Sequence, residues 1–251
     1  MSHDARAVAV LEAAEQLNQT LADLRFGAPV AWVLNPLDYA WPSYAAYVRR
    51  YARGRRRVLF MGMNPGPFGM MQTGIPFGEV KAVRDWLGIA EPLRRAVVSH
   101  PKRPIEGFDC KRSEVSGQRF WAWAAQRWGT ADAFFADAFV LNWCPLAFLE
   151  ASGRNFTPDK LPAPQLRALE RTCDAHLQRV AQTLEVEWAL GLGAFAERRL
   201  RAALASLQPT IAVGGLLHPS PASPAANRGW AAQVDQQLET LGVFALPGSA
   251  P

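Results

Sequence analysis

The stretch Val58-Leu-Phe-Met-Gly-Met-Asn-Pro-Gly-Pro-Phe-Gly-Met-Met-Gln-Thr-Gly-Ile-Pro-Phe-Gly78 decides how this chain folds. It opens as an apolar run from Val58 to Met61, and the part from Gly62 to Gly78 then holds five glycines and three prolines. An apolar run that ends in Gly and Pro predicts a buried strand followed by a long, shaped loop. Ligands of open α/β sheets bind just past the carboxyl ends of the strands, so this loop is a candidate site.

Three further apolar runs predict strands at 139–143, 187–191 and 210–217. Strands that alternate with helices indicate parallel βαβ units, and continuously apolar strands indicate a sheet covered on both faces. We therefore predict an α/β fold of three layers, α/β/α, with a central four-stranded parallel sheet. Residues 1–251 are expected to form a single domain with an N-terminal helix over 7–24 and a frayed tail over 246–251.

The segments between the strands are predicted from their prolines, polarity and helical spacing. Residues 25–45 contain three prolines and are expected to be irregular, and the polar residues 99–118 are expected to form a surface loop. Helical spacing of apolar residues predicts a long helix over 158–184 and a last helix over 225–241.

Composition narrows the class of protein. The 251 residues are 49% hydrophobic, which is enough for a full core, and the net charge is +5. Six arginines lie between Arg49 and Arg57, and such a cluster indicates either a face for a polyanion or a solvated helix end. The three cysteines have no metal-like spacing, and no signal peptide or membrane-length apolar run is present. We expect an intracellular, cytoplasmic protein without a metal site or a membrane span.

Polar side chains occur at the ends of three predicted strands. Asn64 follows the first strand, Asn142 lies in the second, and His218 follows the fourth. Taken singly, these residues are typical of a turn, a buried amide and a cap, but parallel strands bring them to one edge. No carboxylate lies in these motifs, which argues against a hydrolase that uses an Asp or Glu base there. Two amides, a histidine and the ring of Phe77 suit a planar ring with amide groups, such as uracil.

Four motifs together resemble those of a known family, the single-strand-selective monofunctional uracil-DNA glycosylases. The stretch 62–80 resembles the first signature of that family, and 218–230, which begins His-Pro-Ser-Pro, resembles the second. Asn142-Trp-Cys-Pro-Leu146 and the stretch 152–158 are similar to the segments between them. The resemblance runs from about Asn35 to Gly242, and Asn64 separates the chain from uracil-DNA glycosylases with Gly-Gln-Asp-Pro-Tyr in the first motif.

The resemblance implies a DNA repair glycosylase that removes uracil and oxidised pyrimidines, notably 5-hydroxymethyluracil, from single- and double-stranded DNA. It implies an abasic product, with no lyase step, no metal and no cofactor. By position, Asn64 would hold the attacking water and His218 would stabilise the negative charge on the uracil. Asn142 would read the Watson–Crick edge of the base, and Phe77 would stack on its ring.

The remaining implied residues line the pocket or enter the duplex. Backbone at Met63 and Gly66 would line the pocket, with Gly66 leaving room near C5 of the base. The segment that enters the duplex would include Pro219, Ser220, Pro221, Ala222, Ser223, Asn227 and Arg228. The family usually has a basic residue where this chain has Ala222, so the wedge is blunter, with Arg228 nearby.

We expect a monomer that acts on DNA. Two other functions stay open at this point: a module that binds damaged bases without cutting, and a glycosylase that acts on deaminated purines.

Overall fold

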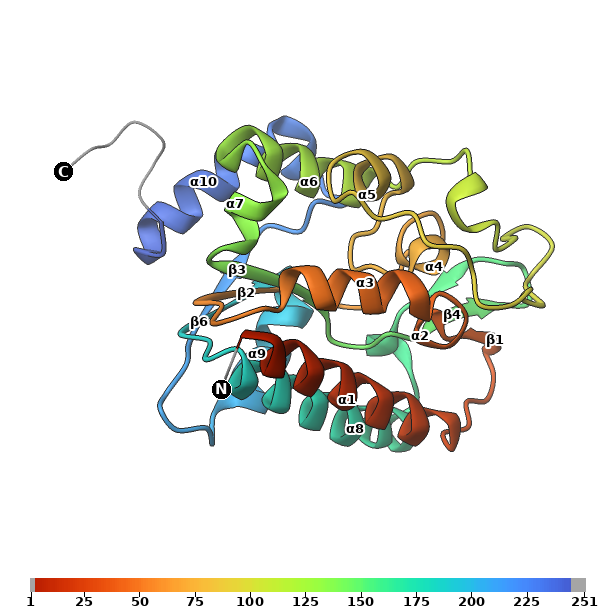
Figure 1. The fold of residues 1–251 in the computed structure, drawn as a ribbon. Helices are drawn as coiled ribbons and strands as arrows, with labels where there is room; N and C mark the ends of the chain where they lie inside the picture. Colours follow the sequence, from red (N-terminus) through yellow and green to blue (C-terminus); the bar gives the residue numbers. More distant parts are fainter. Residues whose placement is uncertain (1–2, 245–251) are drawn as a thin grey trace.

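The structure is a computed structural model that describes residues 3–244. Its main sheet has four parallel strands, as predicted, and their order is β3-β2-β6-β7. Their bounds are β2 Val58–Gly62, β3 Ala138–Asn142, β6 Trp188–Leu192 and β7 Ala212–Leu216. The glycine-rich loop therefore leaves the middle of the sheet, and the carboxyl ends of all four strands share one edge (Figure 1).

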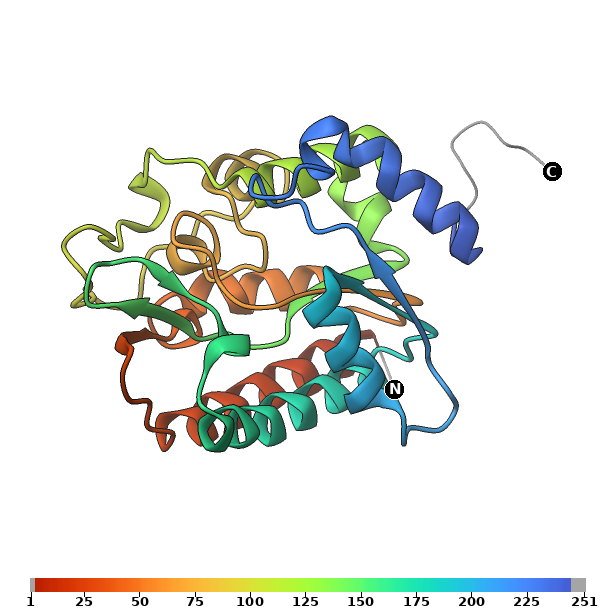
Figure 2. The same cartoon turned by 180° about the vertical axis from the view of Figure 1, so that it is seen from behind.

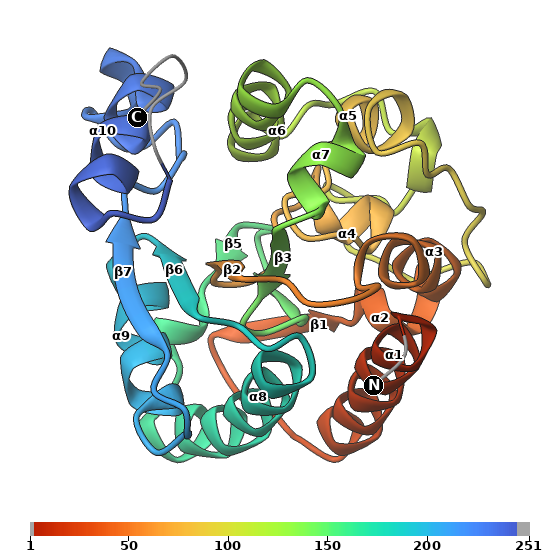
Figure 3. The same cartoon turned by 60° about the vertical axis from the view of Figure 1, so that its left-hand side comes forward.

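Helices cover both faces of this sheet, which confirms the three-layer prediction (Figure 3). One layer contains α8 and α9, with α1 packed on α8, and the other contains α6, α7 and α10. The bounds are α1 His3–Ala22, α6 Val115–Trp128, α7 Ala131–Phe135, α8 Ala163–Thr183, α9 Ala194–Leu204 and α10 Trp230–Leu241. Coverage is uneven: β2 and β3 are buried throughout, whereas the edge strand β7 is partly exposed.

A second sheet was not predicted from the sequence. Strands β1 (Val30–Leu34), β4 (Ala147–Glu150) and β5 (Asn155–Phe156) pair antiparallel in the order β1-β4-β5, to one side of the main sheet (Figure 2). The expectation that 25–45 is irregular is therefore wrong. This segment also contains α2 (Pro36–Tyr39) and the start of α3 (Trp41–Tyr51). Pro36 and Pro42 lie in the first turns of these helices, where proline is tolerated.

Other boundaries differ from the predictions for local reasons. The helix expected from 158 begins at Ala163, after the 3₁₀ turn η2 (Pro158–Lys160). The last helix begins at Trp230 rather than 225, because Gly229 adopts φ 105° after the turn η3 (Ala226–Arg228). The expected surface loop contains η1 (Gly107–Asp109), and two short helices follow β2, α4 (Met70–Thr73) and α5 (Val80–Asp85). The tail expected over 246–251 lies outside the described residues.

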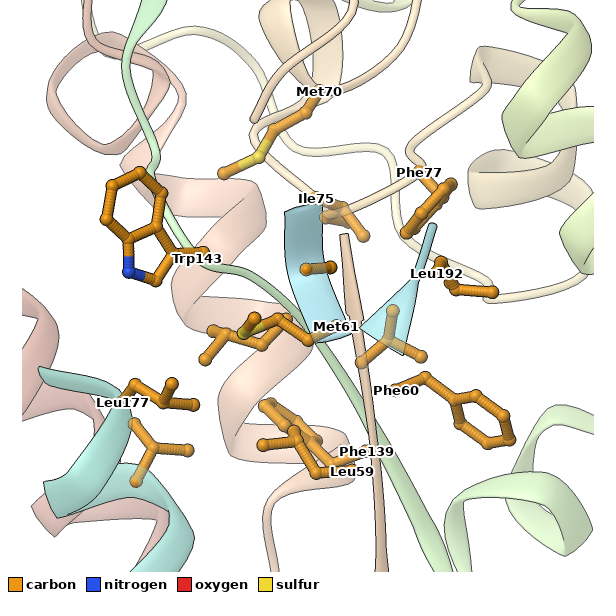
Figure 4. Close-up of a cluster of buried hydrophobic side chains, with 14 of the residues drawn as sticks. Leu59, Phe60, Met61, Met70, Ile75, Phe77, Phe139, Trp143, Leu177 and Leu192 are labelled. Carbon is orange, nitrogen blue, oxygen red and sulfur yellow. The ribbon is translucent and has the colours of Figure 1, made fainter. Parts of the chain in front are cut away.

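A cluster of aromatic and aliphatic side chains fills the space between the sheet and its helices (Figure 4). Phe60 of β2 is fully buried and contacts the rings of Phe134 and Trp123, with centroids 5.9 and 5.8 Å away. Each such side chain contributes about 1.5–3 kcal/mol on burial. The strands that lead to the carboxyl edge of the sheet are thus held in place by a well-packed core.

The arginine cluster at 49–57 lies just before β2, at the end of the sheet opposite to Asn64. Arg57 pairs with Asp137, with its Nη2 2.7 Å from Oδ2, and Arg55 pairs with Glu187. Arg56 is buried and donates to the backbone oxygens of Tyr51 and Arg55. These three arginines therefore serve the fold.

One edge of the main sheet is covered by a side chain. β3 is the outer strand next to β2, so its far side has no neighbouring strand in the sheet. The buried hydroxyl of Tyr47 on α3 donates to the backbone oxygen of Val140 at 2.9 Å and accepts from its N–H at 3.2 Å. The middle of this edge is therefore hydrogen-bonded although no strand pairs with it.

Candidate active site

The carboxyl edge of the sheet carries the polar residues that the sequence singled out. β2 and β3 stay paired beyond their last residues, because Trp143 N donates to Gly62 O and Cys144 N donates to Met63 O, each at 2.9 Å. Asn64, Asn142 and His218 all line one cavity of about 550 Å³ at this edge. The other predicted residues that line it are Met63, Gly66, Phe77, Ser220 and Pro221.

Phe77 and Asn142 meet above a glycine. Phe77 has φ 52°, and its position is fixed by the Trp121 indole, which donates to Phe77 O at 2.9 Å, and by stacking on Phe120 at 5.1 Å. A Cβ atom on Gly62 would overlap Asn142 Oδ1 and would lie 2.8 Å from the Phe77 ring. Only glycine at 62 lets both side chains approach the sheet, a role that the sequence did not reveal.

The amide of Asn64 is oriented by one hydrogen bond. Its Nδ2 donates to the backbone oxygen of Leu146 at 3.3 Å. The side-chain oxygen is then the group left to accept a hydrogen bond, and the residue lines the cavity. An amide fixed in this way can hold a water molecule through its oxygen.

His218 is held as a neutral hydrogen-bond donor. The backbone N–H of Ser220 donates to Nδ1 at 3.0 Å, so the proton of the neutral ring is on Nε2. Burial lowers the pKa of His218 below its ordinary value of 6.5, because the charged ring would lose its hydration. The end of β7 just before it is fixed by α10, since Trp230 Nε1 donates to Leu217 O at 2.7 Å.

The segment 219–228 forms a compact loop beside the cavity. Asn227 Nδ2 donates to Pro221 O at 2.9 Å, and Ala222 N donates to Ser220 Oγ at 3.1 Å. Arg119 of α6 donates to Asn227 Oδ1 at 2.8 Å and to Pro219 O at 3.2 Å. Arg119 thus fixes this loop against the domain, and the Asn227 side chain is engaged within it. Ala222 and Arg228 are exposed.

A carboxylate lies in the cavity after all. Glu114 comes from the segment expected to be a surface loop, and it lines the cavity. Its carboxyl fills the space beside Gly66, Gly69 and Gly117, where Cβ atoms would overlap or touch it. Burial raises its pKa to about 7, with a further contribution from the charge of Glu79. The expectation of a site without a carboxylate is corrected, since the absence held only for the three motifs.

Glu114 should make the stability of the protein depend on pH. Its pKa in the folded chain lies above the ordinary value of 4.5, so the folded state keeps a proton that the unfolded chain releases. Stability should therefore fall as the pH rises from about 4.5 to about 7. The variant Glu114→Gln cannot titrate, and over this window it should gain up to about 3 kcal/mol relative to wild type. Urea unfolding at several pH values measures the difference.

The control for this prediction is Glu91→Gln, because Glu91 is an exposed carboxylate that does not line the cavity. That variant should follow the wild type at every pH. A constant difference between Glu114→Gln and wild type across the window would contradict the assignment of the raised pKa to Glu114.

Among residues 3–244, no group of three or more His, Cys, Asp or Glu side chains is placed to hold a metal ion. In the same part of the chain, every helix is too short or too polar to cross a membrane.

Comparison with known proteins gives the class. Residues 49–241 match the model of the Uracil DNA glycosylase superfamily, so the chain belongs to that superfamily. The crystal structure of the wild-type SMUG2 of Pedobacter heparinus superposes with a TM-score of 0.66 at 20% identity. The match covers 92% of this chain and 97% of that one, and it establishes the shared fold.

Closer relatives give the family within that class. The chain is 52% identical over 231 residues to a single-strand selective monofunctional uracil DNA glycosylase of Bos taurus, a match that covers 92% of this chain and 85% of the relative. It is 51% identical over 236 residues to the enzyme of that name from Mus musculus, with 94% and 85% covered. The chain is thus a monofunctional uracil-DNA glycosylase of this family, a DNA-binding hydrolase of base excision repair.

Proposed function

We propose that this enzyme flips uracil and 5-substituted uracils, such as 5-hydroxymethyluracil, out of single- and double-stranded DNA and hydrolyses the N-glycosidic bond. The product is an abasic site. The observation that carries the proposal is the single cavity that His218, Asn64 and Asn142 line together with the Phe77 ring.

Recognition of the base rests on a ring and an amide. The Phe77 ring is already stacked on Phe120, and the flipped base stacks on the side of it that lines the cavity. Asn142 offers one donor group and one acceptor atom, and uracil presents N3–H and O4 side by side. Because the base must leave the helix stack first, unpaired or damaged bases cost less to extrude, which favours single strands.

Bond cleavage rests on His218 and Asn64. As the bond from C1′ to N1 breaks, negative charge grows on the uracil and positive charge grows on the sugar. The Nε2–H of neutral His218 donates to uracil O2, where part of the negative charge appears. Asn64 positions a water, whose oxygen bonds to C1′ while its proton ends on the released base or solvent. The proposed chemistry draws on no metal ion or cofactor.

Contact with DNA rests on the loop 219–228, which Arg119 fixes beside the cavity. We assign Ala222 and Arg228 to the face that meets the vacated stack, because both are exposed on this loop. Because the proposed substrate is chromosomal DNA, we expect the enzyme to act inside the cell, where the chromosome is. The enzyme acts as a monomer in this proposal, because one chain supplies all the groups named here.

The test is a panel of oligonucleotides, single- and double-stranded, that carry uracil, 5-hydroxymethyluracil or a deaminated purine. Release of the uracil bases, seen as strand cleavage after alkali, is the expected result, with faster release from single strands. Binding without any release would favour the damaged-base-binding module. Release of deaminated purines in preference to uracil would replace the proposed substrate class.

A further inference from the structure

A second group of basic residues lies in the segment 102–112, which leads directly into the cavity-lining residues Ser113 and Glu114. We name Lys102, Arg103, Lys111 and Arg112 the basic lip. Arg103 is partly buried and the other three are exposed. Unlike Arg55 and Arg57 at the far end of the sheet, none of the four forms an ion pair with a described residue.

Two arginines of the basic lip lie over an aromatic ring that lines the cavity. Phe68 lines the cavity, and the guanidinium carbons of Arg112 and Arg103 lie over its ring, 3.9 and 5.3 Å from the centroid. A guanidinium that stacks on a ring keeps the N–H groups at its edge free to bind a phosphate. Both guanidinium groups therefore lie against a ring of the cavity wall and keep N–H groups that can donate to a phosphate.

Part of the basic lip is fixed in place before any ligand binds. Arg103 Nε donates to Gly153 O at 3.0 Å, in the turn between β4 and β5. His100 bridges the same two segments, because its Nδ1 accepts from Lys102 N at 3.1 Å and its Nε2 lies 3.1 Å from Ala151 O. A charge held in position loses less conformational entropy on binding than a free side chain does.

Nearby carboxylates form no ion pair with the basic lip among the described residues. Glu106 and Asp109 lie in the same segment, but neither pairs with a basic side chain among the described residues. Burial raises the pKa of the Cys110 thiol, and the neighbouring Glu106 raises it further. Glu114 is turned toward the glycines of the loop after β2.

We propose that the basic lip binds backbone phosphates of the DNA strand whose nucleotide enters the cavity, at a place on the rim separate from the loop 219–228. The inference rests on the proposed function for its ligand. Phosphate contacts fix the register of a protein on DNA and carry no sequence information, which suits an enzyme that must find a base in any context. In the sequence, the cluster at 49–57 was the most conspicuous group of basic residues, and whether it forms a face for a polyanion or a solvated helix end was left open.

The test measures binding rather than base release. The probe is a labelled single-stranded oligonucleotide with a stable abasic-site analogue, titrated at several salt concentrations. The variant Arg103→Gln/Arg112→Gln should bind about tenfold more weakly, and the slope of log K against log salt should fall by roughly 0.7 for each phosphate that the variant no longer binds. Arg55→Gln, from the cluster at 49–57, is the matched control and should keep both the affinity and the slope of the wild type.

Further variants separate charge from packing. Arg112→Lys keeps the charge and should therefore keep the slope of log K against log salt. The double variant Lys102→Gln/Lys111→Gln removes exposed charge but leaves the two arginines on Phe68 unchanged, and it should lower the slope. If the Gln variants bind with wild-type affinity and slope, the basic lip does not contact DNA. This result is distinct from failure of the proposed function, in which the wild type would bind the probe but release no uracil.

Discussion

Replacing His218 by alanine should lower kcat for uracil release by about a hundredfold or more. The ring donates from Nε2 to the oxygen on which charge grows, and loss of one such preorganised donor typically has an effect of this size. The change should fall mainly on kcat, since the donor acts most strongly as the bond breaks. Single-turnover kinetics on a single-stranded oligonucleotide with one uracil measure the effect.

His218→Gln is the informative companion variant. A glutamine amide is neutral and can both accept from Ser220 N and donate toward the base, so part of the activity should return. Because burial lowers the pKa of His218, any loss of rate through protonation of this ring should begin at a lower pH than it would for a histidine with the ordinary pKa of 6.5. A rate for His218→Ala near that of wild type, with the fold intact, would overturn the assigned role.

Replacing Asn64 by alanine should also lower kcat by about a hundredfold or more. The amide oxygen is the group proposed to hold the water, and misplacement of a reactant by about 1 Å can have an effect of this size. Affinity for an oligonucleotide with an abasic-site analogue should stay near that of wild type, because Asn64 is proposed to hold the water rather than the DNA. Single-turnover rates and the binding titration together separate the two effects.

The stability of Asn64→Ala is the necessary control. Its only described side-chain hydrogen bond is the 3.3 Å contact with Leu146 O, so its loss should reduce the free energy of unfolding by about 1 kcal/mol. Thermal unfolding that matches wild type within that margin, together with an unchanged rate, would show that another group activates the water.

The four parallel strands were predictable because each is a short apolar run closed by Gly, Pro or a polar residue. The antiparallel sheet was not, and β1 explains why. Val30–Leu34 is apolar at every position although it is buried only at its two ends. The alternation of apolar and polar residues that indicates a half-buried strand is therefore absent from the sequence. Pro29 before this strand and Pro36 and Pro42 after it favoured an irregular segment. In the structure, Pro36 and Pro42 instead lie in the first turns of helices.

The motif residues at the cavity were predictable because parallel strands must bring their carboxyl ends to one edge. Glu114 was not, because its neighbours in space are glycines of the loop after β2, which lie far away in sequence. Gly117, which falls in the loop expected over 99–118, lies inside α6, and an isolated glycine in a helix usually has a packing reason. A Cβ atom there would overlap Phe77 O, so the glycine does report the contact between α6 and the cavity loop.

The hydroxyl of Tyr47 on Val140 has a consequence for how these molecules behave together at high concentration. A bare edge strand offers unpaired N–H and C=O groups on which a strand from another molecule can add, and that is a common start of aggregation. Here the side chain of Tyr47 occupies both groups at the middle of β3, inside the core of its own chain. The sheet is thereby closed to growth on this side, which favours a dispersed enzyme.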